Sequence, residues 1–332
     1  MTSHPLEFSE DLQDTSPATR IGLSRAGVSR SAKAIRLAFG GSEHYMDATV
    51  ECVVDLDPDQ KGVHMSRFEE VVNEAIGEAV VGGSALRAEQ LAETIAETVR
   101  DRQGAKRADV TIAARYPEHK PAPVSGVMTQ EIYTMFGAAA ATEKGTRRLV
   151  GVAAQGMTAC PCAQELVAAS ARRNLEAAGY DESQVEEIIE AVPVATHNQR
   201  GLGTLHIGST ENNPIDVEAA DLLAIVEDSM SSEIYELMKR SDEGAVVEKA
   251  HRRPRFVEDC VREMIQGVVD RYGNLDDGTF VSARQENLET IHQHNVVAER
   301  FGLLGELRHE LATGEHLEHH TSMREWLDAA GR

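Results

Sequence analysis

The stretch Tyr45-Met46-Asp47-Ala48-Thr49-Val50-Glu51-Cys52-Val53-Val54-Asp55-Leu56 alternates between apolar and polar side chains. A period of two places alternate side chains on opposite faces of an extended chain and is typical of a half-buried antiparallel strand. The apolar face comprises Met46, Ala48, Val50, Cys52, Val54 and Leu56. The stretch therefore predicts an antiparallel sheet with one face against a core, in which Cys52 fills space as a small apolar side chain.

Outward from this strand, the periodicity predicts two groups of helices and strands. The first group contains helices at 66–79 and 85–100 and strands at 110–114, 128–136 and 148–154. The second group contains helices at 163–178, 184–191, 217–239 and 257–272 and strands at 204–210 and 280–284. Two groups of similar make-up indicate a duplicated α+β unit with antiparallel sheets.

Four segments are predicted from these groups. An extended lead-in at 1–30 precedes a first unit at 31–155, and a second unit follows at 156–300. Residues 301–332 form an acidic, His-rich C-terminal extension with histidines at His309, His316, His319 and His320. We interpret this extension as a peripheral helix, with metal binding by its histidines as the alternative.

The composition excludes some classes of partner. The 332 residues carry a formal net charge of −22, which argues against non-specific binding to nucleic acid. Such a surface fits a protein from a salt-rich cytosol, and an ordinary acidic enzyme is the alternative. With no long apolar run and no signal-peptide core, we expect a cytoplasmic protein without a membrane partner.

Two short motifs carry the candidate chemistry: Cys160-Pro161-Cys162 and Thr196-His197-Asn198-Gln199-Arg200-Gly201. A closely spaced cysteine pair in a large cytosolic chain indicates metal binding or catalysis rather than a disulfide framework. Sulfur plus imidazole is a ligand set for zinc or iron, and a metal with a free coordination position activates water. The motifs therefore predict a hydrolase, with a closed structural metal site in a non-catalytic protein as the alternative.

Taken in order, the motifs resemble the type IB GTP cyclohydrolases. The resemblance also rests on segments 61–68, 122–126, 235–240, 255–259 and 287–292. The long helical insertion at 163–195 resembles the archaeal branch of that family, whose product is 7,8-dihydroneopterin 2′,3′-cyclic phosphate. A bacterial-style enzyme that makes dihydroneopterin triphosphate is the alternative. The acidic composition agrees with a haloarchaeal source.

The resemblance implies a fold and a metal. The expected fold is two tandem tunnelling-fold units per chain, with antiparallel sheets and helices on one face, assembled into barrels in a homo-oligomer (dimer or tetramer). Active sites are expected at subunit interfaces, with GTP as substrate and Fe²⁺ as the metal, Zn²⁺ or Mn²⁺ being alternatives. The implied ligands are Cys160, His197 and Glu243. After Lys239-Arg240, Ser241 replaces the family's usual proline, and Asp242 is a competing ligand.

The resemblance also assigns roles around the metal. Glu258 is expected to accept two hydrogen bonds from the guanine edge. The expected catalytic residues, besides the ligand Cys160, are Cys162, Glu289 and His292, and His294 and Asn295 are further candidates for proton transfer. For Cys162, packing is the alternative. The triphosphate is expected to bind Lys61, His64, Arg67, Lys120 and Arg200.

Overall fold

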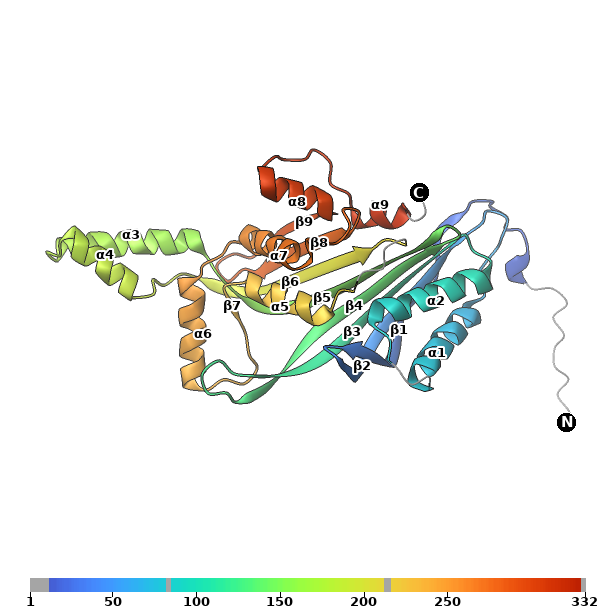
Figure 1. Cartoon of the computed structure of the whole chain (residues 1–332), viewed down its shortest axis with the longest axis horizontal. Helices are drawn as coiled ribbons and strands as arrows, with labels where there is room; N and C mark the ends of the chain where they lie inside the picture. Colours follow the sequence, from blue (N-terminus) through green and yellow to red (C-terminus); the bar gives the residue numbers. More distant parts are fainter. Residues whose placement is uncertain (1–11, 82–84, 212–215, 330–332) are drawn as a thin grey trace.

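The computed structural model describes residues 12–81, 85–211 and 216–329. Within these residues a single antiparallel sheet of nine strands runs in the order β1-β2-β3-β4-β5-β6-β8-β9, with the short β7 paired to β5 (Figure 1). The strands are β1 Leu23–Phe39, β2 Ser42–Leu56, β3 Arg107–Pro121, β4 Met128–Thr142, β5 Gly145–Ala159, β6 Asn198–Ser209, β7 Ser232–Glu233, β8 Phe280–Leu288 and β9 Val296–Leu303.

Most helices lie between strands in the chain order, whereas η1 precedes β1 and α8 and α9 follow β9. They are the 3-10 turn η1 Leu12–Asp14 and the α-helices α1 Met65–Val81, α2 Ala88–Gln103, α3 Pro161–Ala177, α4 Glu182–Ala191, α5 Ala219–Ser229, α6 Arg240–Arg252, α7 Val257–Tyr272, α8 Leu304–Thr313 and α9 Met323–Asp328. Within the described residues, no helix combines the length and apolar character needed to span a bilayer.

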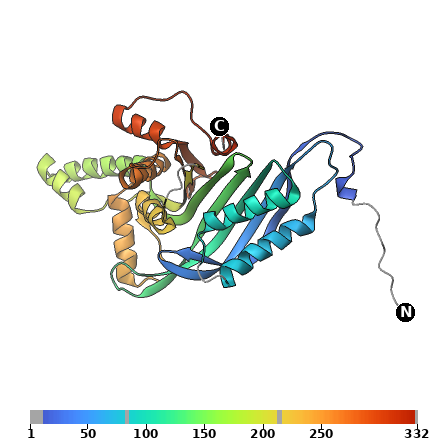
Figure 2. The same cartoon turned by 45° about the vertical axis from the view of Figure 1, so that its right-hand side comes forward.

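One face of the sheet carries the main core. Helices α1 and α2 lie over the first strands, and α5 and α7 lie over the later ones (Figure 2). Because side chains alternate along a strand, Val150 and Val152 of β5 point into this core, whereas Leu149 packs on the opposite face with Phe280 and Trp326. The period-two pattern predicted for 45–56 is confirmed, with Cys52 fully buried.

The same run of elements occurs twice. The first repeat is β1-β2-α1-α2-β3-β4, and the second is β5-β6-α5-α7-β8-β9. The second repeat has two additions, the α3–α4 hairpin between β5 and β6 and the β7–α6 segment between α5 and α7. The predicted α+β class is confirmed, and the long insertion predicted at 163–195 is the α3–α4 hairpin, which projects from one end of the sheet (Figure 1).

Several predicted boundaries are wrong. The divisions at 30/31, 155/156 and 300/301 fall inside β1, β5 and β9, and the order of elements places the repeat boundary at the β4–β5 turn, residues 143–144. These strands extend past the divisions because their ends pair with neighbouring strands, a contact that local composition does not reveal. Residues 1–11 of the predicted lead-in lie outside the described residues.

The helix predicted at 217–239 is also wrong. Helix α5 ends at Ser229, and the chain then turns to pair with β5 as β7. The Ala159 N–H donates to the Ser231 hydroxyl at 3.1 Å, which holds this turn against the end of β5. The helical periodicity of the segment was therefore overridden by a tertiary contact, and a second helix, α6, begins only at Arg240.

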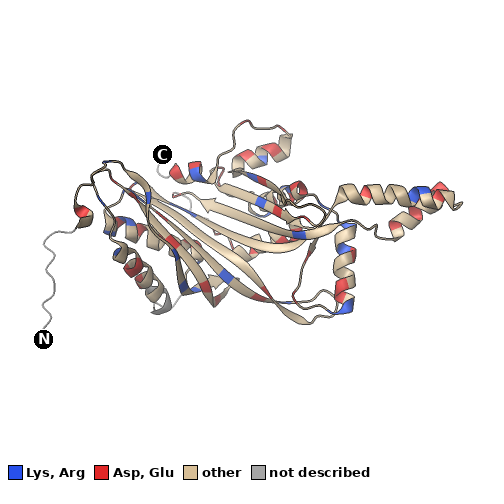
Figure 3. Cartoon of the chain, turned by 180° about the vertical axis from the view of Figure 1, so that it is seen from behind, with Lys and Arg blue, Asp and Glu red and all other residues tan. Residues whose placement is uncertain are grey.

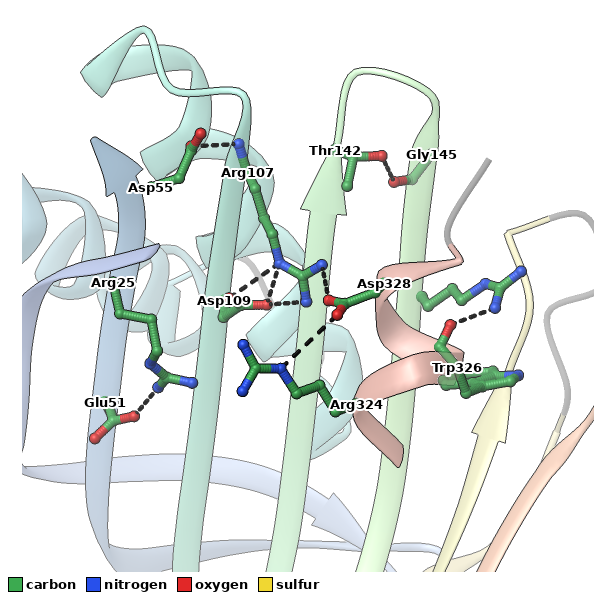
Figure 4. Close-up of polar contacts among 11 residues, drawn as sticks. Arg25, Glu51, Asp55, Arg107, Asp109, Thr142, Gly145, Arg324, Trp326 and Asp328 are labelled. Carbon is green, nitrogen blue, oxygen red and sulfur yellow. Dashed lines mark hydrogen bonds and ion pairs between the residues drawn. The ribbon is translucent and has the colours of Figure 1, made fainter. Parts of the chain in front are cut away.

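The C-terminal extension passes from one face of the sheet to the other. Leu304 and Leu307 of α8 belong to the core under the helices, whereas Trp326 of α9 lies on the opposite face, 5.5 Å from the Phe280 ring. The Trp326 indole N–H donates to the Gly278 carbonyl at 3.0 Å. Figure 4 shows Arg107 bridging Asp109 and Asp328, which fastens the end of α9 to β3.

Charged side chains of both signs cover the surface. On the face seen in Figure 3, Lys and Arg are interspersed with Asp and Glu along strands and helices. Ion pairs such as Arg172 with Glu186 on the α3–α4 hairpin and Arg252 with Glu248 on α6 are exposed. Exposed pairs of this kind contribute little to stability, typically about 0–1 kcal/mol each.

Candidate metal and nucleotide site

Cys160 and His197 lie at the tip of the β5–β6 hairpin. The last pair of this ladder is Ala159 with Asn198, so the two candidate ligands directly follow and precede paired residues. The Cys160 N–H donates to the His197 carbonyl at 3.1 Å, and the Thr196 hydroxyl donates to the Cys160 carbonyl at 2.8 Å. These bonds hold the backbones of Cys160 and His197 together at the base of the α3–α4 insertion.

A cavity of about 270 Å³ opens beside this tip. Five residues singled out from the sequence line it: Cys160, His197, Glu258, Glu289 and His292. They come from the ends of β5 and β6, the start of α7 and the loop after β8, which are far apart in the sequence. His294 lines the same cavity, whereas Cys162 and Asn295 are exposed and are not among its lining residues.

The His197 ring is oriented by a residue to which the sequence assigned no role. Its Nδ1 lies 3.1 Å from the Gln199 Oε1, and the Gln199 Nε2 donates to the Thr158 hydroxyl at 3.0 Å. The Gln199 oxygen therefore accepts from Nδ1–H, which leaves His197 Nε2 as the nitrogen available to a metal. Gln199 belongs to the quoted His-Asn-Gln-Arg motif, and its position two residues beyond His197 on one strand face was the available signal.

Glu258 is the second residue of α7 and is exposed at the cavity. The Arg255 N–H donates to the Ala159 carbonyl at 3.0 Å, and the Arg255 guanidinium reaches the Ser229 carbonyl at 2.6 Å and the Glu263 carboxylate at 2.8 Å. These contacts tie the first turn of α7 to the end of β5, so the carboxylate of Glu258 is presented beside Cys160. Arg255 belongs to the segment 255–259 that carries the family resemblance.

Asp242 has a structural role. Its fully buried carboxylate accepts from the Val124 and Ser125 N–H groups at 2.8 Å, from the Ser125 hydroxyl at 2.6 Å and from the Lys239 N–H at 2.8 Å. Burial alone would raise its pKa, but these hydrogen bonds hold the pKa of Asp242 well below its usual range. All of these contacts anchor the loop at 122–126 to α6, so Asp242 is not placed to compete for a metal.

Glu243 is not brought to the cavity within one chain. It is exposed and lines a different cavity of about 430 Å³ together with Arg240 and His251. The part of α6 that contacts the β5–β6 tip is His251, whose Nε2 is 3.3 Å from the Thr196 carbonyl. Glu243 lies two turns earlier on the same helix, about 12 Å away along the helix axis. A carboxylate that does lie beside His197 is that of Glu289, whose Oε2 is 3.9 Å from the His197 Nδ1.

The donors at the cavity suit a metal with free coordination positions. A thiol, an imidazole with one free nitrogen and a nearby carboxylate match the preferences of iron or zinc. Within the part of the chain that the structure describes, these atoms do not form a closed group: the cluster of three potential ligand atoms within 4.8 Å is Glu310, His316 and His320, at a different place. A four-ligand structural site at Cys160 is therefore not assembled by one chain.

The predicted phosphate-binding residues fall into two sets. Lys120 and Arg200 lie at the same edge of the sheet as Cys160; Lys120 is paired with Glu227 at 2.5 Å, and Arg200 is exposed.

Lys61, His64 and Arg67 lie in the β2–α1 connection and the first turn of α1, at the opposite edge of the sheet. The 15-residue strand β5 spans the two edges, a distance of about 50 Å at 3.3 Å per residue. One chain does not bring Lys61, His64 and Arg67 to the cavity.

A family profile described as type I GTP cyclohydrolase folE2 matches residues 10–298. The chain belongs to the type I GTP cyclohydrolase family. Among its relatives, the protein named GTP cyclohydrolase MptA of Methanococcus aeolicus is 39% identical, over 91% of this chain and 99% of that protein. The MptA of Methanocaldococcus jannaschii is 38% identical over 92% and 98%, and that of Methanosarcina mazei 38% over 91% and 97%. The predicted resemblance, and with it the prediction of an enzyme, is confirmed.

Solved structures support the fold. The crystal structure of uricase from Arthrobacter globiformis matches 89% of this chain and 96% of that chain with a TM-score of 0.50 and 7% sequence identity. A hyper-thermostable variant of the same kind of enzyme matches with the same TM-score and 8% identity. At such low identity the similarity concerns the fold alone. It confirms the tunnelling-fold class, whereas assembly into barrels stays a prediction.

Proposed function

We propose that the chain is a metal-dependent GTP cyclohydrolase that forms 7,8-dihydroneopterin 2′,3′-cyclic phosphate and acts in pterin biosynthesis. The reaction opens the guanine imidazole ring at C8, releases that carbon as formate and closes the pterin ring. The observation that carries the proposal is the cavity that gathers Cys160, His197, Glu258, Glu289 and His292. The identity of 38–39% to proteins named GTP cyclohydrolase MptA supports the cyclic phosphate as the product.

The metal that we propose is Fe²⁺, held by Cys160 and His197, with Zn²⁺ or Mn²⁺ as alternatives. The chemistry that such an ion supplies is activation of water near neutral pH. The third ligand follows as Glu243 from the family resemblance, whereas within one chain Glu289 is the candidate, because it shares the cavity with Cys160 and His197. A thiolate ligand in this position makes the site sensitive to oxidation.

The protein side chains position GTP and move protons. Glu258, at the start of α7, has two carboxylate oxygens to accept the adjacent N–H donors of the guanine edge. Because Glu258 shares its cavity with Cys160 and His197, we propose that a purine anchored on Glu258 directs C8 and N7 toward the tip that carries these two residues. His292 and Glu289, which line the same cavity, are placed to deliver the proton that N7 needs when the ring opens.

We further propose that a homo-oligomer completes the site. Lys61, His64 and Arg67 lie at the sheet edge remote from Cys160, so they contribute to a triphosphate site only through a second copy of the chain. Arg200 is exposed beside the cavity and is available within the chain. Subunit interfaces are accordingly the expected location of the complete active site.

The product of an anaerobic reaction tests the proposal. The full chain is incubated with Fe²⁺ and GTP, and the pterin is analysed by mass spectrometry while formate is measured. Formate together with a cyclic monophosphate supports the proposal. A pterin triphosphate would contradict the cyclic phosphate and assign the chain the reaction of the bacterial-style enzyme. If metal is bound but neither formate nor pterin forms, a non-catalytic metal protein is favoured.

The third ligand is tested by matched variants. Glu243→Gln and Glu289→Gln are purified anaerobically, and bound iron is counted beside turnover. The ligand substitution should lower metal content by at least tenfold, as expected when one of three ligands is removed. The other substitution should retain metal; for Glu289→Gln, retained metal with lost turnover would assign Glu289 to proton transfer.

A further inference from the structure

The C-terminal extension contains a compact group of metal-ligand side chains. Helix α8 ends at Gly314, whose φ of +71° reverses the chain so that the following segment passes over Glu310. The His316 Nδ1 lies 4.0 Å and the His320 Nε2 3.9 Å from the same Glu310 oxygen, Oε1. The three potential ligand atoms lie within 4.8 Å of one another, and the two rings are nearly perpendicular, 5.7 Å apart.

Glu310 is held as an oriented carboxylate. Arg300 of β9 donates to its Oε2 from Nη2 at 2.8 Å and from Nε at 3.2 Å. The Leu317 N–H donates to Oε1 at 3.2 Å. Burial alone would raise the pKa of Glu310, but these hydrogen bonds lower it. Arg300 therefore fixes one oxygen, and the other oxygen faces the two imidazoles, as outer partners orient metal-binding carboxylates.

His320 supplies an independent sign of a missing ligand. Its Nε2 is buried and has no hydrogen-bond partner among the described residues. The 3.9 Å to Glu310 is too long for a hydrogen bond. Because a buried ring nitrogen without a partner is unfavourable, a third atom between His320 and Glu310 would satisfy both groups.

We infer that Glu310, His316 and His320 bind a divalent transition metal ion, with Zn²⁺ as the expected ion. Two imidazoles and a carboxylate are a known zinc ligand set and leave one position for water. Ligands bound at about 2.0–2.2 Å in a tetrahedron lie about 3.4 Å apart, so each imidazole nitrogen, now 3.9–4.0 Å from Glu310 Oε1, must approach it by roughly 0.5 Å. The His316 side chain is 82% exposed and is free to make this movement.

The site would fasten the extension between two fixed points. Leu307 of α8 is buried in the core, and Trp326 of α9 is buried on the opposite face of the sheet. A cavity of about 500 Å³ between α7, β9 and α8 is lined by the three ligands and also by Glu258. The three ligands lie outside the residues matched by the family profile, and the inference is independent of the proposed function.

Metal titration separates this site from the one at Cys160. The chain with Cys160→Ala and His197→Ala is titrated with Co²⁺ and Zn²⁺, using visible absorption and equilibrium dialysis. We expect one equivalent to bind, with a tetrahedral Co²⁺ spectrum that lacks the near-ultraviolet thiolate band that Cys160 would give. His316→Ala in this background should weaken binding at least tenfold, while the control His309→Ala should leave it unchanged.

The outcomes decide the inference. No metal bound in the double variant, or equal affinities of the His316→Ala and His309→Ala proteins, would overturn it and leave an ordinary His–carboxylate ion pair. If the double variant fails to fold, the otherwise native chain is compared with His316→Ala, and the stoichiometry should fall by one. Loss of turnover in the Cys160 variants with the tail site intact would concern the proposed function only.

Discussion

The two repeats place different chemistry at the same structural position. In the first repeat, β1 and β2 are joined by the two-residue turn Gly40-Gly41, which closes on the pair Phe39 with Ser42. In the second repeat the corresponding strands end at Ala159 and Asn198, and Cys160 and His197 stand where the two glycines stand. The sheet accommodates a two-residue turn and a long insertion alike, because only the residues that flank each connection pair between the strands.

The helix starts make a second comparison. Glu89 and Glu258 are each the second residue of a helix that packs on its repeat's sheet, α2 and α7. Glu258 is exposed at the cavity, whereas Glu89 is 7% exposed, and burial raises the pKa of Glu89 to about 7. Each repeat thus places a carboxylate at the same helix position. Exposure to solvent makes the Glu258 carboxylate a candidate binding group, whereas the Glu89 carboxylate is buried.

The largest expected effect concerns the hairpin tip of the second repeat. Cys160→Ala removes the thiol and should abolish metal content and turnover together, because one of the proposed ligands is lost. Metal analysis and formate release on the same anaerobic preparation measure the two properties. Full turnover by a metal-free Cys160→Ala protein would remove the basis for assigning the site to this tip.

The next effect concerns Glu258. Glu258→Gln replaces one acceptor oxygen by a donor, so it should lower kcat/KM for GTP by about 100-fold, or about 2.7 kcal/mol. Bound metal should be unchanged, because Glu258 is not a proposed ligand. Steady-state kinetics and metal analysis check both statements, and loss of metal in this variant would instead exchange the roles proposed for Glu243 and Glu258.

Glu89→Gln should change stability rather than activity. The pKa of Glu89 is raised from 4.5 to about 7 in the folded chain, so its ionisation destabilises the fold progressively between pH 4.5 and 7 and by a constant amount above. At pH 8 the variant should therefore have a free energy of unfolding higher than that of the wild type by roughly 3 kcal/mol, measured by denaturant unfolding. This gain should shrink steadily when the unfolding is repeated at pH 7 and pH 6.

A gain at pH 8 that persists unchanged at pH 6 would contradict a charge origin of the Glu89→Gln effect. GTP turnover provides the contrast with the second repeat. At saturating substrate, the Glu89→Gln protein should keep the wild-type rate, because Glu89 is buried and is not among the residues that line the candidate cavity.

The smallest effect concerns the glycine turn of the first repeat. Gly41 has φ of +76°, and a Cβ there would meet open space. The only cost of Gly41→Ala is therefore the strain of placing alanine in the left-handed backbone region. A loss of about 1 kcal/mol in the free energy of unfolding is expected. Metal content and turnover should stay at wild-type values, and a drop in either would show that the two tips are not independent.

The sequence predicts best where local pattern and tertiary contact agree. Helix α7 has the predicted bounds, because its buried residues Val257, Val261, Ile265 and Val268 recur at helical spacing. Helix α5 is shorter than predicted, because Ser231 and β7 bond to the end of β5, a partner more than 70 residues away in the chain. Strand β9 was missed because its sequence begins with three consecutive apolar residues, Val296, Val297 and Ala298, and so lacks a clear period of two.

The candidate site was predictable to a similar degree. Motif order sufficed to single out Cys160, His197, Glu258, Glu289 and His292, which share one cavity. Two facts depend on three-dimensional arrangement. The sheet register sends Lys61, His64 and Arg67 to the far edge, and α6 carries Glu243 to a separate cavity. No pattern within the sequence reports either distance.

The closed base of the α3–α4 hairpin has a practical consequence for engineering. The Cys160 N–H to His197 carbonyl bond and the Thr196 to Cys160 bond close the connection below the helices. Beyond them the hairpin also contacts α6, through Gln164 to the His251 carbonyl and through Arg252 to the Glu190 and Ala191 carbonyls. Loop entropy changes only slowly with length, so trimming or exchanging the hairpin costs little in chain closure. A replacement segment should therefore keep both closing bonds at Cys160 and supply new partners for the groups of α6 that the hairpin now contacts.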